Sequence, residues 1–252
     1  ILTILIASAK SSVSLAQTVQ PSLVNFSDTL AFSGKAYRLN TETLLYSEHH
    51  LIKLNNSGDY ISSQVKYTDK NGLTMAIKSL DFSSGLTTPQ LTFIDERTQS
   101  TIKVNILNKG KQKTVQIYNA QGTNNTLESL NPHNFDNSII DAGFNLFVKK
   151  HWDTLLKGNN IEVDFLALTR AEYIGFDLHR FKSKRFKSED LIVLRLRPSN
   201  FIIRLLMDPI YLTYNKDTKR LLQYEGLTNI ERVDNGVASG DNIVARIEYS
   251  YE

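Results

Sequence analysis

The chain has 252 residues, of which 41% are hydrophobic and 22% are charged, and its formal net charge is +3. This length and composition can bury a sizeable core, in one large β domain or two smaller ones. The sequence contains no cysteine, which excludes disulfides, thiolate metal sites, cysteine nucleophiles and an acylated lipoprotein cysteine. The net charge is small and the basic residues are scattered, so we expect no nucleic-acid partner.

The first residues have the pattern of a secretory signal whose beginning is missing. An apolar run over residues 1–9 precedes Ser14, Leu15 and Ala16, a small-residue pattern typical of a cleavage site. We predict a truncated signal peptide over residues 1–16, cleaved after Ala16, and a single β-rich domain over residues 17–252. The alternatives are cleavage after Ala9, a buried strand or a truncated membrane anchor.

Export and the absence of cysteine together indicate a compartment. An exported chain of this length without disulfides is easier to reconcile with the periplasm of a Gram-negative bacterium than with a eukaryotic surface. No later apolar run is long enough to span a bilayer as a helix, so we expect no integral membrane segment after cleavage.

Segments that alternate apolar and polar residues, separated by turn residues, begin near residue 34 and predict an antiparallel meander. Asn71-Gly72 favours a tight hairpin, because both residues tolerate positive φ. The polar, Asn-rich stretch over residues 119–136 is interpreted as a loop. The strands expected in this half are 34–40, 44–54, 60–68, 73–82, 91–95, 101–107 and 114–118.

The period then changes to that of a helix, predicted over about residues 138–156. Its apolar positions fall on one helical stripe. Ser138 with Asp141 resembles a capping box, and Gly158 stands where a C-terminal glycine belongs. The stripe consists of Ile140, Phe144, Phe147, Val148, His151 and Leu155.

Alternating segments resume after the helix. Residues 201–207 fit a short helix or a strand. The other strands expected in this half are 161–169, 172–182, 191–197, 210–214, 221–224 and 243–251. The predicted fold class is mainly β (α+β): a curved antiparallel sheet or half-barrel wrapped around one central helix, because the helical stripe needs a concave apolar face to bury against.

Several stretches together resemble a family of uncharacterised exported proteins from gammaproteobacteria. The resemblance covers most of the mature chain and implies a compartment, since that family has no assigned activity. The stretches are Gly34-Lys35-Ala36-Tyr37, Leu44 to His49, Leu80-Asp81-Phe82, Pro89, Asp95-Glu96-Arg97, Tyr224 to Ile230 and Ala245 to Tyr249. In architecture alone, an exported sheet wrapped on a helix is similar to the LolA/LolB-type half-barrels, which carry lipoprotein acyl chains across the periplasm.

Two groups of residues are candidates for a site. Phe144, Phe147, Val148 and His151 could line a ligand cavity between helix and sheet, although such stripes are more often plain core. His49, Asp81, Asp95 and Arg97 would form a polar cluster if their strands pair, either as an acid/base pair tuned by arginine or as an ion pair at a strand end. His49 and His50 point to opposite strand faces, so they cannot easily share a metal.

No phosphate-binding glycine loop, zinc-binding H-E-x-x-H or nucleophile elbow occurs, and no catalytic residue, cofactor or metal is predicted. Within Tyr224 to Asn229 we expect Gly226 to permit a bulge and Asn229 to bond backbone at a turn. The leading hypothesis is a periplasmic, non-enzymatic protein that binds a hydrophobic ligand or an envelope partner. The alternatives are a hydrolase using the acidic and histidine residues of the first meander, and a small outer-membrane barrel. The sequence specifies no oligomeric state.

Overall fold

A computed structural model describes residues 28–109, 112–132, 135–182, 188–234 and 237–251. The predicted signal peptide therefore lies outside the described residues. Within them the strands are β1 (Asp28–Arg38), β2 (Leu44–Leu54), β3 (Tyr60–Asp69), β4 (Thr74–Asp81), β5 (Gln90–Asp95), β6 (Ser100–Lys109), β7 (Gln112–Gln121), β8 (Asn124–Leu130), β9 (Ser138–Ile139), β10 (Ile161–Ala167), β11 (Glu172–Arg180), β12 (Leu191–Pro198), β13 (Ile210–Asn215), β14 (Leu221–Asp234) and β15 (Val237–Tyr251).

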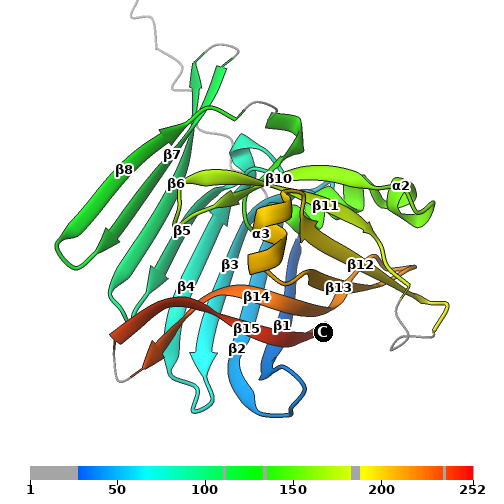
Figure 1. The fold of residues 1–252 in the computed structure, drawn as a ribbon, viewed down its shortest axis with the longest axis horizontal. Coiled ribbons are helices and arrows are strands. Elements are labelled where there is room, and N and C mark those ends of the chain that lie inside the picture. The colour runs from blue at the N-terminus through cyan, green and yellow to red at the C-terminus, as the bar shows by residue number, and fades with distance from the viewer. Residues whose placement is uncertain (1–27, 110–111, 133–134, 183–187, 235–236, 252) are drawn as a thin grey trace, which may run out of the picture.

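All of these strands belong to one sheet, and Figure 1 shows it as a continuous curved surface from β8 through β1 to β10. The order is β8-β7-β6-β5-β4-β3-β2-β1-β15-β14-β13-β12-β11-β10-β9, and in the described residues it does not close. Neighbours are antiparallel except β9 and β10. The predicted fold class is confirmed: the chain is mainly β, with one curved sheet and few helices.

Short helices replace the single predicted helix over 138–156. They are α1 (Gly143–Lys150) and α2 (Trp152–Leu156), and they meet at His151. Ser138 does not cap a helix as expected, because it belongs to β9 and is paired with Asp164 of β10. Asp141 has a φ of 46°, a left-handed conformation that aspartate tolerates, so the chain cannot be helical there.

One other expectation is corrected, and one alternative that was left open is decided. Residues 124–130 form β8 at one edge of the sheet, although their polar sequence predicts a loop. Residues 201–206 form the short helix α3 (Phe201–Leu206), and its cap is the side chain of Asn200. The remaining helical turns are η1 (Phe82–Ser84) and η2 (Phe135–Asn137). No helix in the described ranges is long and apolar enough to span a bilayer.

The core has two parts, and α1 with the preceding segment lies between them. Ile140 packs with the inward side chains of β1 to β7, among them Tyr46, Val65 and Ile117. Four other residues of the stripe pack with β10 to β13: Phe144, Phe147, Val148 and Leu155. Gly143 fits here because a Cβ at this position would lie 2.2 Å from the Thr87 carbonyl oxygen. The curved sheet therefore buries its helical segment from both sides.

Candidate functional site

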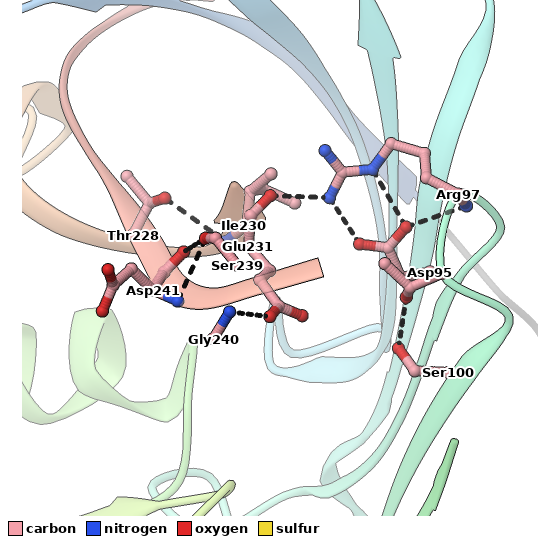
Figure 2. Close-up of polar contacts among 10 residues, drawn as sticks. Asp95, Arg97, Ser100, Thr228, Ile230, Glu231, Ser239, Gly240 and Asp241 are labelled. Carbon is pink, nitrogen blue, oxygen red and sulfur yellow. Dashed lines mark hydrogen bonds and ion pairs between the residues drawn. The ribbon is translucent and has the colours of Figure 1, made fainter. Parts of the chain in front are cut away.

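The structure brings together two of the four residues of the predicted polar cluster. The guanidinium of Arg97 donates from Nε to Asp95 Oδ1 at 2.9 Å, and its Nη2 also donates to Asp95 Oδ2. The same Nη2 donates to the Glu231 carbonyl oxygen at 3.0 Å (Figure 2). Arg97 thus joins the end of β5 to the distal part of the β14–β15 hairpin.

Asp81 and His49 lie elsewhere. Asp95 pairs with Ala76 at the start of β4, whereas Asp81 ends that strand, about 17 Å away at the usual rise per residue. Asp81 is exposed and accepts a hydrogen bond from Ser83 N at 2.8 Å, which caps η1. His49 is exposed and contacts the Thr68 hydroxyl at 3.3 Å. These residues do not converge on one pocket, and no group of three or more metal-ligating side chains occurs among the described residues.

A buried ion pair that the sequence analysis did not identify lies on the inward-facing side of the sheet. Lys78 of β4 points inward, and its Nζ is 2.7 Å from Asp141 Oδ1; the two side chains are 8% and 2% exposed. Burial alone would lower the pKa of Lys78, but the adjacent carboxylate outweighs it and the pKa is raised above its ordinary value. Asn229 of β14 donates to Asp141 Oδ2 at 2.7 Å. Asp141 therefore ties β4, the start of the helical segment and β14 together.

A second polar pair lies beside it on β2. His50 Nε2 is 2.8 Å from Glu48 Oε2, and both side chains are largely buried. The His50 ring stacks on Phe32 with 4.2 Å between the ring centroids. Four tyrosines surround the two pairs, two of them buried and two half-buried, and desolvation raises the pKa of each phenol. They are Tyr46, Tyr67, Tyr224 and Tyr249.

Each charged group of this arrangement already has a partner within the protein. The ammonium of Lys78 faces a carboxylate, the carboxylate of Glu48 faces an imidazole, and Asp95 accepts from Arg97. Such pairs have satisfied their polar atoms against one another, which stabilises a fold more directly than it prepares a proton transfer. We therefore interpret the polar interior as structural: Asp141 and Arg97 join separate strands, and Glu48 pairs with His50 along β2.

The predicted cavity-lining residues lie where the helices meet the second half of the sheet. Phe147 and Val148 have no exposed surface, and Phe144 is 8% exposed. His151 is half-buried, with its ring centroid 4.4 Å from that of Phe147, and burial followed by the charge of Lys150 lowers its pKa. A ligand cavity along this stripe stays a prediction, and complete burial of two members is what ordinary core packing gives.

The largest concentration of exposed apolar side chains on one element lies on α3. We call this the α3 surface; it consists of Phe201, Ile202, Leu205 and Leu206, which are 67–84% exposed. Spacings of one, four and five residues place all four on one face of the helix. A cluster of large apolar side chains in water marks an interaction site more often than scattered ones do. The sequence showed the apolar run at 201–206 but not that it would lie outside the core.

No family model matches the chain, and no curated protein matches it. Among solved structures, one similar chain is a β-barrel-like protein of a domain of unknown function (DUF1849) from Brucella abortus. It is 4% identical, covers 89% of this chain and 97% of its own, and has a TM-score of 0.38. A porin-like protein from Bacteroides uniformis is 9% identical, covers 88% and 96%, and has a TM-score of 0.23. Such scores carry no functional inference, and the resemblance to exported gammaproteobacterial proteins stays a prediction.

Proposed function

We propose that the protein is a non-enzymatic protein of the bacterial periplasm that binds an apolar partner of the cell envelope. The observation that carries the proposal is the α3 surface. Four large apolar side chains on a six-residue helix face solvent, where each costs free energy unless another apolar surface covers it. The periplasmic address comes from the N-terminal sequence and the absence of cysteine.

Two further observations support this version over its alternatives. The complete burial of Phe147 and Val148 favours a partner on the outside over a ligand held along that stripe. The mutual pairing of Lys78 with Asp141 and of Arg97 with Asp95 favours a binding role over hydrolysis.

The test compares adhesion to an apolar support. Leu205→Gln/Leu206→Gln removes half of the α3 surface while keeping good helix formers. Leu73→Gln/Leu127→Gln is the matched control, because both leucines are 67% exposed, Leu73 in the turn between β3 and β4 and Leu127 on β8. We expect wild type and the control to be retained on a phenyl or butyl matrix and the α3 variant to elute early. Equal retention of all three would remove the α3 surface as the binding site. Native mass spectrometry before and after organic extraction covers the internal-ligand alternative, and an extractable lipid in wild type would reinstate it.

A further inference from the structure

The α3 surface is small and self-contained. From the exposed fractions of its four side chains, its area is about 500 Å², given that large apolar and aromatic residues each carry up to roughly 200 Å². A stable protein–protein interface buries about 800 Å² on each partner. The surface is therefore too small by itself to hold a second copy of the chain.

Binding to a lipid bilayer has different structural requirements, and α3 fits them. Apolar tips that enter a membrane surface need little area, but their backbone must satisfy its polar groups internally. The Asn200 side chain accepts from Ile202 N at 2.8 Å and Ile203 N at 3.3 Å, and Met207 N donates to the Ile203 carbonyl at 3.0 Å. Two N–H groups of the first turn and one carbonyl near the end of the helix thus have partners within the helix and its caps.

The opposite face of the helix is fixed to the sheet by Arg204. Its Nε donates to the Pro198 carbonyl at 3.0 Å, its Nη2 donates to the Ser199 carbonyl at 3.0 Å, and the same Nη2 lies 3.4 Å from Asp177. These bonds hold the helix against β12 while its apolar face stays outside. A rigid support lowers the entropy that binding would cost.

The charges at the base of α3 decide which lipid it would accept. Arg197 and Arg204 share the carboxylate of Asp177, while Asp208 follows Met207 at the end of the helix, and Asp164 lies beside Gly175, as Ser199 does. Two positive and three negative groups leave no basic surface of the kind that recruits proteins to anionic lipids. The apolar side chains must then supply the binding, and salt should not weaken it.

From these contacts we infer that α3 docks the protein on a lipid bilayer by inserting Phe201, Ile202, Leu205 and Leu206 at the boundary of headgroups and acyl chains, without requiring anionic lipid. This inference rests on the proposed function and names its partner. A bilayer, rather than an apolar protein, is the envelope surface that a small, rigid and uncharged apolar tip fits.

The experiment is flotation of the full chain with phosphatidylcholine vesicles at low and high salt. We expect wild type and Leu73→Gln/Leu127→Gln to float with the vesicles at both salt concentrations. Leu205→Gln/Leu206→Gln should lose at least about tenfold in partitioning. A second measurement places the helix directly: Phe201→Trp should be quenched by brominated lipid, whereas the native Trp152, 3% exposed, should not.

Each outcome decides the inference. Failure of wild type to float overturns it, while retention on the apolar matrix would leave the proposed function standing. Equal flotation of wild type and the α3 variant, without quenching of Phe201→Trp, places any binding elsewhere, such as the apolar N-terminal run that all variants share. Sedimentation showing a dimer that only the α3 variant loses would overturn it in favour of a second copy.

Discussion

Replacing Lys78 with methionine should destabilise the protein by about 4 kcal/mol at pH 7. The magnitude follows from burial. The ammonium and the Asp141 carboxylate are 2.7 Å apart with side chains 8% and 2% exposed, and at an effective dielectric constant near 20 their attraction is about 6 kcal/mol. Lys78→Met removes this attraction and leaves the carboxylate desolvated. Asp141 can then avoid its charge by binding a proton, which costs about 4 kcal/mol at pH 7 from an ordinary pKa near 3.9.

The complementary variant should respond to pH in the opposite direction. Asp141→Asn keeps the left-handed backbone acceptable but leaves the ammonium of Lys78 without its partner. Escape by deprotonation costs about 5 kcal/mol at pH 7, from an ordinary pKa near 10.4. In Lys78→Met the folded state holds an extra proton, so the loss should shrink as the pH falls towards 5. In Asp141→Asn the folded state lacks one, so the loss should shrink as the pH rises towards 9.

The assay is urea denaturation followed by circular dichroism at three pH values, for wild type, both single variants and the double variant. With both charges removed, the double variant should be more stable than either single variant, with a coupling free energy of about 3 kcal/mol or more. Losses that simply add in the double variant, or that do not change with pH, would refute the view that Asp141 and Lys78 stabilise the fold as a buried pair.

Two other predictions concern the interior. Alkali should unfold the protein cooperatively between about pH 11 and 12. Burial raises the pKa of the buried phenols in the folded protein, so above about pH 10 these groups lose their protons only on unfolding. Five such groups lower the free energy of unfolding by about 7 kcal/mol per pH unit. Tyrosinate absorbance should rise together with loss of circular dichroism; gradual ionisation of a folded chain would contradict this. The groups are Tyr46, Tyr67, Tyr214, Tyr224 and Tyr249. Gly143→Ala should cost at least about 2 kcal/mol in thermal or urea unfolding, because its Cβ would lie 2.2 Å from the Thr87 carbonyl oxygen. Gly175→Ala is the control, since its nearest neighbour lies at 3.6 Å; equal losses would disprove the clash.

The sequence predicted the elements whose side chains alternate and missed those that neighbours impose. Asn71-Gly72 marks the observed hairpin between β3 and β4, because its signal is local. Residues 124–130 of β8 are mostly exposed, so they carry no apolar alternation; their pairing with β7 makes them a strand. The helix predicted over 138–156 starts only at Gly143 because Ser138 joins β10 in the sheet, a contact that no helical period reveals.

The candidate site was less accessible to the same reasoning. Lys78 lies between Ala76 and Leu80 on the inward face of its strand, where the alternation predicts an apolar residue. This was the available signal, since inward positions of a strand are rarely charged unless the charge is paired. Its partner Asp141 is 63 residues further along the chain, being residue 141 against 78, and nothing local links them. Asn229 was expected to bond backbone at a turn, and instead it donates to Asp141. The α3 surface required knowing which side of the sheet the helix occupies.

The strand order has a consequence for how the chain can be connected. β1 and β15 are neighbours in the middle of the sheet, and the two edges, β8 and β9, are consecutive in sequence. From β10 to β15 and on from β1 to β8, the strand order is therefore a circular permutation of an up-and-down meander, and β9 lies parallel to β10 at one edge. A gene re-cut between Leu130 and Ser138, with a short turn joining Tyr251 to Asp28, would encode that meander and turn the pairing of the first and last described strands into a hairpin. In the natural order, one edge of β1 stays unpaired until β15, the last described strand, is in place. Because this pairing joins residues far apart in sequence, we expect the natural chain to fold more slowly than the permuted one.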